Sequence, residues 1–113
     1  MQTKVTHEAA SHRFEIWLDS ERVGLMDYTV RPGEIHLTHT EVDPAHRGKS
    51  LAAILLRESL NQIRELNLGK VVPVCSYTVK YMELHPETHD LLLNPIAEAA
   101  AACKLPKRTD TET

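Results

Sequence analysis

Apolar and polar residues alternate at strand period in three stretches of the first 42 residues. The predicted strands are residues 12–18, 23–31 and 34–42. In the first of them, Phe14, Ile16 and Leu18 form the apolar set. Asp19 to Arg22 and Pro32-Gly33 are turn-forming segments, so the three strands are expected to be antiparallel neighbours. Residues 1–11 are polar, and we expect them to be loose.

The pattern changes to helical period after Lys49. Apolar residues recur at steps of three or four as far as Leu68, which predicts one long amphipathic helix that Gly69 ends. The stripe consists of Ala52, Leu55, Leu56, Leu60, Ile63 and Leu66. Residues 70–75 form a short apolar strand, and a strand, helix and strand of these lengths predict a right-handed crossover with residues 34–42 and 70–75 parallel.

The remaining sequence predicts smaller elements. Ser76 can cap a helix over residues 77–84, which Pro86 ends. Residues 91–93 suggest a short strand, residues 96–103 an alanine-rich helix, and residues 104–113 a disordered polar tail. The fold class is therefore α/β (α+β), with a mixed sheet in a single domain over residues 12–103.

Composition and charge argue against several classes of function. A chain of 113 residues with a net charge of −3 and no long basic run is not typical of a nucleic-acid-binding protein. No long apolar run or signal-peptide pattern is present, so we expect no membrane segment and a cytoplasmic location. Cys75 and Cys103 form neither a disulfide framework nor a zinc-binding spacing, and no metal site is expected.

The loop before the long helix has the character of an anion site. The first turn of a helix has backbone N–H groups without intrahelical partners, at the positive end of the helix dipole. Gly48 allows close backbone approach, while Arg47 and Lys49 add positive charge. Together with Ser50 and Leu51, these residues predict a phosphate or pyrophosphate site. The loop is neither a Walker A motif nor a dinucleotide fingerprint, and an ordinary turn with solvated charges is the alternative.

Residues 39–60 (HTEVDPAHRGKSLAAILLRESL), followed by VVPVCSYTVKYMELHPE, resemble the GNAT-type N-acetyltransferase superfamily and in particular its small single-domain members. The resemblance covers about residues 12 to 92. The usual pyrophosphate signature has glutamine or arginine three residues before its glycine, and glycine or alanine two residues after it. Ala45 and Ser50 depart from that signature at its two ends.

The resemblance implies a fold, a co-substrate and a reaction. Acetyl-CoA would bind between the ends of the two parallel strands and give its acetyl group to an amine, which could be a protein lysine, an N-terminus or a small amine. The pyrophosphate would lie on Arg47 to Ser50, the pantetheine along Thr40 to Val42, and the thioester near Cys75. Larger members have a helical pair after the first strand, so its absence here implies an open acceptor groove.

His39 and Glu41 are two residues apart on a strand and therefore point to the same face. A protonated amine, with a reference pKa of about 10, must lose a proton before it attacks a thioester, and an imidazole or a carboxylate can accept that proton. A polar stripe that only faces solvent is the alternative.

Three further residues have two interpretations each. Cys75 precedes a helix start, where its thiol could be activated as a nucleophile, or it could be an inert thiol among apolar neighbours. Tyr77 and Tyr81 are one helical turn apart, and either could protonate the departing thiolate or simply pack in the core. The resemblance favours a cysteine near the acyl group.

A second function is open from the sequence. The departures at Ala45 and Ser50 and the missing helical pair also fit a non-catalytic acyl-CoA-binding or interaction module with the same fold. In either case the protein is expected to be a monomer or a homodimer.

Overall fold

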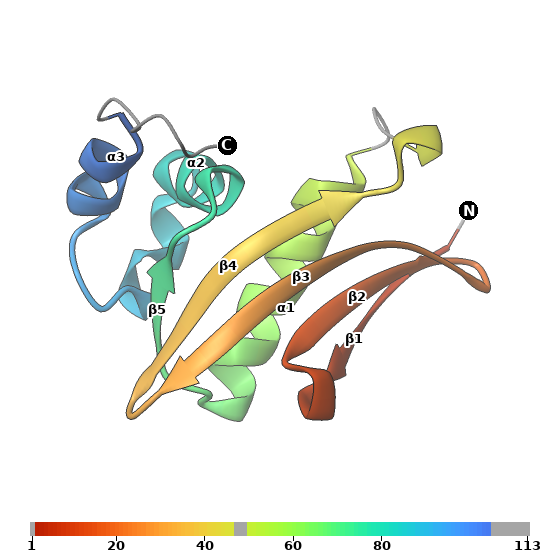
Figure 1. Cartoon of the computed structure of the whole chain (residues 1–113), viewed down its shortest axis with the longest axis horizontal. Coiled ribbons are helices and arrows are strands. Elements are labelled where there is room, and N and C mark those ends of the chain that lie inside the picture. Colours follow the sequence, from red (N-terminus) through yellow and green to blue (C-terminus); the bar gives the residue numbers. More distant parts are fainter. Residues whose placement is uncertain (1, 47–49, 105–113) are drawn as a thin grey trace, which may run out of the picture.

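The computed structural model describes residues 2–46 and 50–104, and its centre is one twisted five-stranded sheet (Figure 1). The strands are β1 (Thr3–Glu8), β2 (Arg13–Leu18), β3 (Glu21–Arg31), β4 (Glu34–Val42) and β5 (Lys70–Pro73). They are arranged in chain order, antiparallel from β1 to β4, while β4 and β5 are parallel. This confirms the predicted fold class and the parallel crossover.

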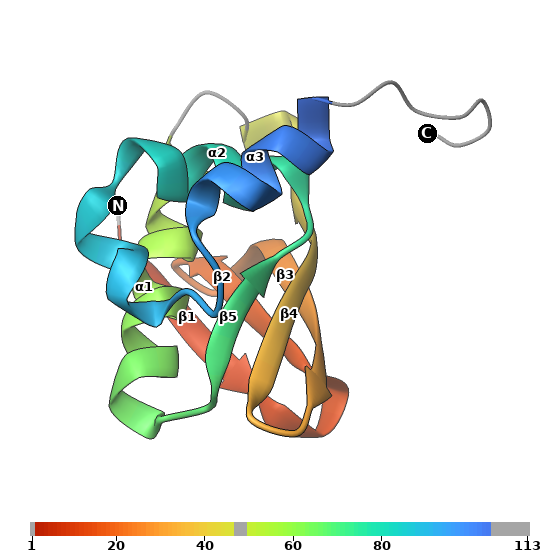
Figure 2. The ribbon, with the colours of Figure 1, turned by 90° about the vertical axis from the view of Figure 1, so that its left-hand side faces the viewer.

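The helices pack on one face and beyond one edge of the sheet. They are α1 (Leu51–Leu66), α2 (Ser76–Leu84) and α3 (Ile96–Lys104), with short 3-10 turns at Ala9–Ser11, Pro44–His46 and Pro86–Leu91. Helix α1 lies behind the sheet, and α2 and α3 lie together near β5 (Figures 1 and 2). Within the described residues, no helix has the length and apolar character needed to span a membrane.

The core fills the space between the sheet and α1. Its fully buried side chains come from β2, β3 and β4, from α1, and from α2. They include Phe14, Ile16, Met26, Ile35, Leu37, Leu55, Leu56, Leu60 and Met82. Burying each such side chain contributes about 1.5–3 kcal/mol, so this one layer of contacts is the main source of stability.

The first strand was not expected, and the prediction that residues 1–11 are loose is wrong over Thr3–Glu8. This segment pairs with β2 along its whole length. Val5 packs against the core, and the His7 ring stacks on Phe14 with ring centroids 4.5 Å apart. A single apolar residue among polar ones gives too weak an alternation to reveal such an edge strand.

Several element ends also differ from expectation. Asn67, in the left-handed conformation, caps α1, and Gly69 follows with its own positive φ of 134°. Cys75 rather than Ser76 is the N-cap of α2, and β5 ends at Pro73. Residues 91–93 form only one bridge, Leu92 to Val71. Leu66 is 54% exposed and does not belong to the buried stripe of α1.

A bulge divides β4. Tyr28 pairs with Leu37 and Asp27 pairs with His39, so Thr38 is an extra residue on β4. Before the bulge, Ile35 and Leu37 point toward α1 and are fully buried. An extra residue shifts the alternation by one, so after it the even-numbered residues point toward α1 instead.

The two parallel strands separate beyond this point. Their pairing runs from Glu34 with Lys70 to Leu37 with Pro73. The backbone N–H groups of Val74 and Cys75 then both donate to the Leu37 carbonyl oxygen, at 3.0 Å each, and the chain turns into α2. Figure 1 shows the second half of β4 continuing away from β5. The edge of β4 that faces β5 is therefore free of β5 from Thr38 onward.

Candidate functional site

A groove of about 590 Å³ lies along the separated half of β4, between this strand and the first turns of α1 and α2. It is lined by His39, Thr40, Glu41, Val42, Asp43, Pro44, Ala52 and Tyr77. Five of these residues were predicted as site residues from the sequence. Asp43, Pro44 and Ala52 were not, because a strand-ending Asp-Pro and a helical alanine give no chemical signal.

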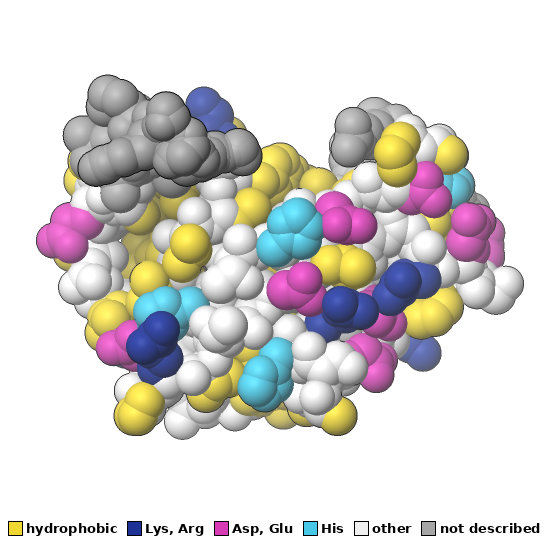
Figure 3. Space-filling view, viewed as in Figure 1, with side chains coloured by type: hydrophobic (Ala, Val, Ile, Leu, Met, Phe, Trp, Pro, Cys, Tyr) yellow, Lys and Arg dark blue, Asp and Glu magenta, His cyan; other side chains and the backbone are white. Residues whose placement is uncertain are grey.

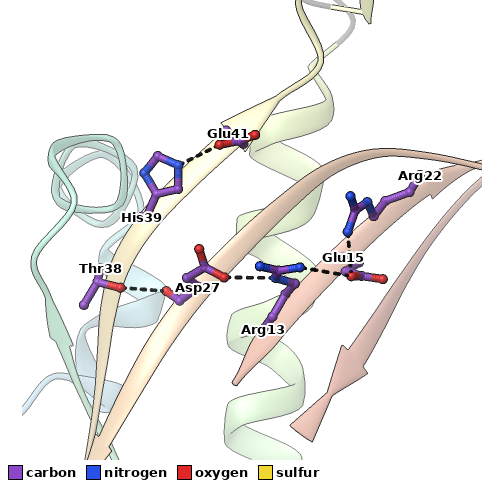
Figure 4. Close-up of polar contacts among 7 residues, drawn as sticks. All are labelled: Arg13, Glu15, Arg22, Asp27, Thr38, His39 and Glu41. Atoms are coloured by element: carbon purple, nitrogen blue, oxygen red, sulfur yellow. Dashed lines mark hydrogen bonds and ion pairs between the residues drawn. The ribbon is translucent and has the colours of Figure 1, made fainter. Parts of the chain in front are cut away.

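His39 and Glu41 form a hydrogen-bonded pair, as their shared face predicted. The His39 Nε2 atom lies 2.8 Å from Glu41 Oε1, and both side chains are more than half exposed (Figure 4). The bulge at Thr38 turns this pair to the open face of the sheet, away from α1. When Nε2 carries the proton in this contact, Nδ1 has the lone pair that can accept another proton.

Thr40 and Val42 point to the opposite face from this pair. Val42 packs against the core, and the Thr40 Oγ1 atom is buried with no hydrogen-bond partner among the described residues. A buried hydroxyl without a partner is costly, and a ligand that enters the groove could supply the missing hydrogen bond.

The structure separates the two candidate tyrosines. Tyr77 lines the groove and is 40% exposed, whereas Tyr81 is only 7% exposed and its ring stacks on His85 with centroids 3.9 Å apart. Desolvation by burial raises the pKa of both phenols. Tyr77 therefore has a protonated hydroxyl beside the groove at neutral pH, while Tyr81 has the position of a packing residue.

Cys75 lies where the second parallel strand has ended, as the N-cap of α2, and its thiol is half-buried and free. Its backbone is fixed at both sides, because its N–H donates to the Leu37 carbonyl oxygen and its own carbonyl accepts from the Val79 N–H at 3.1 Å. It is not among the residues that line the groove. The structure thus places Cys75 near the strand separation but not in the groove wall.

The predicted anion site is only partly described. Arg47, Gly48 and Lys49 lie outside the described residues. Ser50 is exposed at the N-cap of α1 with a φ of 60°, and its carbonyl accepts from the Ile54 N–H. Leu51 is buried in the core, so its side chain does not line the groove.

The face of the sheet opposite α1 is polar and open. The Arg13 guanidinium contacts Asp27 at 3.0 Å and Glu15 at 3.8 Å, and Arg22 contacts Glu15 at 3.0 Å (Figure 4). Figure 3 shows basic and acidic side chains interspersed over the right half of this face. A polar face needs no helices to cover it, and β2 is followed directly by β3, as the sequence predicted.

One set of side chains could offer ligands to a metal ion. Among the described residues, Glu21, Asp43 and His46 bring their ligand atoms within 4.8 Å of one another. The Asp43 carboxylate already accepts a hydrogen bond from the Ala45 N–H, and His46 lies 3.8 Å from Glu21. We assign no metal to this cluster.

Comparison with known proteins identifies related sequences and structures. The family model described as "GCN5-related N-acetyl-transferase" matches residues 13–91. No curated protein is significantly similar to the chain.

Solved structures match only in part. The ribosomal-protein-S18-alanine N-acetyltransferase of Escherichia coli has a TM-score of 0.49 at 16% identity, covering 54% of this chain and 39% of that protein. The ribosomal-protein-alanine N-acetyltransferase of Brucella melitensis has a TM-score of 0.48 at 20% identity, with 66% and 59% covered. The PaiA N-acetyltransferase of Thermoplasma acidophilum in complex with coenzyme A has a TM-score of 0.45 at 16% identity, with 50% and 35% covered. At this level of similarity, these structures carry no argument about the substrate of this chain.

Proposed function

Because the chain belongs to the GCN5-related N-acetyl-transferase family, we propose that it is an acetyltransferase that uses acetyl-CoA and transfers the acetyl group to a primary amine. The observation that carries this proposal is the separation of β5 from β4 after Leu37, which leaves a groove with a proton-accepting pair on one side and a buried, unpartnered hydroxyl on the other.

The groove fits the pantetheine arm of acetyl-CoA. An extended amide-containing chain can pair with a free strand edge as an added strand, and β4 offers such an edge from Thr38 to Val42. The Thr40 hydroxyl is the additional polar partner. The pyrophosphate would then lie on Arg47 to Ser50, which follow β4 and precede α1 in the chain.

Acetyl-CoA supplies a thioester carbonyl carbon that an amine nitrogen can attack. In the transfer a carbon–nitrogen bond forms and the carbon–sulfur bond breaks, so the amine loses one proton and the thiolate sulfur gains one. His39 accepts the proton from the amine at Nδ1, with Glu41 holding the ring at Nε2. This division of roles gives Glu41 the orienting function and His39 the function of the base.

Tyr77 is the proton donor to the leaving sulfur. Its pKa is raised by desolvation, so the phenol keeps its proton at neutral pH, and it lines the same groove as His39. The sulfur leaves more easily when a nearby acid can protonate it. Tyr77 is therefore expected to contribute to the rate of transfer rather than to binding.

We propose direct attack of the amine, without an acetyl-cysteine intermediate. Acetyl-CoA is already a thioester, so passing the acetyl group to the Cys75 thiol would gain little driving force, and Cys75 is not in the groove wall. Intact-protein mass spectrometry after incubation with acetyl-CoA alone tests this. A stoichiometric acetyl adduct on Cys75 that an amine then removes would overturn direct attack.

The acceptor is a protein lysine, a protein N-terminus or a small amine. A non-catalytic acyl-CoA-binding module is the second candidate, favoured by the departures of Ala45 and Ser50 from the usual loop signature. An assay of free CoA thiol with a panel of primary amines separates the two candidates. Amine-dependent release of CoA supports the enzyme, whereas binding of acetyl-CoA without any release identifies the binding module.

A further inference from the structure

A second groove, of about 330 Å³, lies between β5 and α3. Its walls are mostly apolar and include Val72, Pro73, Val74, Pro95 and Ala99, and Glu98 is the one charged residue among the described residues that line it. In Figure 3 an apolar hollow is visible on the left of the open face, on the side of β5 and α3. Nothing in the proposed transfer of the acetyl group uses this groove.

Large apolar side chains at and beside this groove are exposed to solvent rather than packed in the core. Val74 is 52% exposed although it directly follows the buried Pro73, and Leu93, whose N–H donates to the carbonyl oxygen of Val71 in the groove wall, is 41% exposed. Such a concave apolar surface with few polar groups is typical of a small-molecule site, and its volume is at the lower end of the range for such sites.

The strand pairing fixes how far this groove lies from the proposed base. Val72 is the pairing partner of His36 across the sheet, so both point to the open face. Val74 follows two residues later, where its N–H donates to the Leu37 carbonyl oxygen. The Val74 nitrogen lies 3.0 Å from that oxygen, and His39 is two residues further along β4, about 7 Å from Leu37. The backbone of Val74 therefore lies within about 10 Å of the backbone of His39, a distance that an extended alkylamine can span.

The two ends of the surface between His39 and the groove differ in chemistry. At the β4 end, His39 and Glu41 present a proton acceptor and a carboxylate that attracts an ammonium group. At the β5 end, the lining is mostly valine, proline and alanine, with Asn94 and Glu98 as its polar residues. A second ammonium group would lose hydration along most of this lining and could be compensated only at Glu98. An acceptor with one amine and an apolar body matches both ends.

We propose that the groove between β5 and α3 is a subsite for the acceptor, and that the acceptor class is a primary amine carried on an alkyl or aryl body. This inference rests on the proposed acetyltransferase function and names its substrate class. It excludes a diamine or polyamine as the preferred acceptor.

The test compares two amines of equal length. Hexylamine ends in a methyl group where 1,5-diaminopentane ends in a second ammonium, so the pair differs only in what would enter the groove. We expect kcat/KM at least tenfold higher for hexylamine, and an increase of about fourfold per methylene from propylamine to hexylamine as each methylene is buried.

Variants locate the effect in the groove. Ala99→Trp fills it and should remove most of the preference for hexylamine while leaving the KM for acetyl-CoA unchanged, and Ala97→Trp, an exposed position on the same helix, is the control. If Ala99→Trp does not fold, Val74→Asp serves instead, with Val30→Asp as a control of equal exposure on β3.

Three results would overturn the inference. Equal or better use of 1,5-diaminopentane shows that the acceptor is not apolar, and an unchanged preference in Ala99→Trp or Val74→Asp places the apolar body elsewhere. These two results contradict only the subsite, because the protein would still transfer the acetyl group. If no amine causes the release of CoA, the proposed acetyltransferase function is wrong, and the subsite is then wrong as well.

Discussion

The two halves of β4 belong to one continuous strand and have different surroundings. From Glu34 to Leu37 the strand is paired on both sides, by β3 and β5, and its apolar residues are fully buried under α1. From Thr38 to Val42 it is paired with β3 alone, and its other edge faces a groove. The first half stabilises the domain, and the second half has strand geometry with backbone groups and side chains that can bind a ligand.

The single extra residue at Thr38 is what separates these roles. If Thr38 were paired in a regular strand without the bulge, His39 and Glu41 would lie on the same face as Ile35 and Leu37 and point into the core. With it, the pair lies on the open face while Thr40 and Val42 take the inner face. A bulge therefore converts a structural strand into a site without changing its direction.

The first half should respond to mutation through stability. Leu37→Ala removes a fully buried side chain and should lower the free energy of unfolding by about 2–5 kcal/mol, measured by urea denaturation. The half-buried Val42→Ala is the matched change in the second half and should cost less. Equal losses at the two positions would contradict the division of the strand.

The second half should respond through turnover. His39→Ala should lower kcat about a hundredfold, the usual contribution of a general base, with little change in the unfolding transition or in the affinity for acetyl-CoA. Glu41→Gln should have the same direction and a smaller effect, because Glu41 orients the imidazole. Full activity of both variants would exclude the pair as the base.

Tyr77 and Tyr81 test the same contrast on α2. Tyr77→Phe should lower kcat about tenfold by removing the proton donor in the groove, whereas Tyr81→Phe should leave kcat nearly unchanged because Tyr81 is buried against His85. The measurement is steady-state release of CoA under saturating acetyl-CoA. A larger loss of kcat in Tyr81→Phe would reverse the assignment.

The smallest expected effect is on the pH dependence of stability, through a residue paired with the first half of β4. Tyr28, the partner of Leu37, has its hydroxyl 2.6 Å from His7 Nε2, and burial lowers the pKa of His7. The unfolded chain therefore binds this proton at a higher pH than the folded chain does. The contribution of neutral His7 to the free energy of unfolding is therefore complete above about pH 7. It declines as the pH falls below about 6.5, the ordinary pKa of histidine.

His7→Phe keeps a ring at this position and removes the titration. The variant should be slightly less stable than the parent above pH 7, because the bond to Tyr28 is lost, and the difference should shrink or reverse near about pH 5. Thermal unfolding at several pH values measures it. A difference that is constant with pH would show that His7 does not contribute by this route.

Much of the fold could be predicted from the sequence because its elements are strongly periodic. β2, β3, β4, α1 and the parallel crossover follow from alternation and helical spacing. β1 could not be predicted, because its contribution depends on the contacts of Val5 and His7 with residues far along the chain. The site was predicted as a set of residues, but which face His39 and Glu41 occupy depends on a bulge with no glycine or proline to mark it.

The choice between the tyrosines shows the same limit. Spacing along a helix places Tyr77 and Tyr81 on neighbouring turns, and only the packing of α2 shows that one lines the groove and the other is buried. Cys75 was correctly placed at a helix start, but its absence from the groove wall depends on where β5 ends.

The central claim is that acetyl-CoA binds along the second half of β4. Backbone amide chemical shifts, recorded by NMR during a titration with acetyl-CoA, test it most directly. We predict the largest changes at Thr38 to Val42 and at Tyr77, with small changes from Glu34 to Leu37. Changes concentrated in the first half of the strand or confined to the groove between β5 and α3, or no changes at saturating acetyl-CoA, would contradict the account.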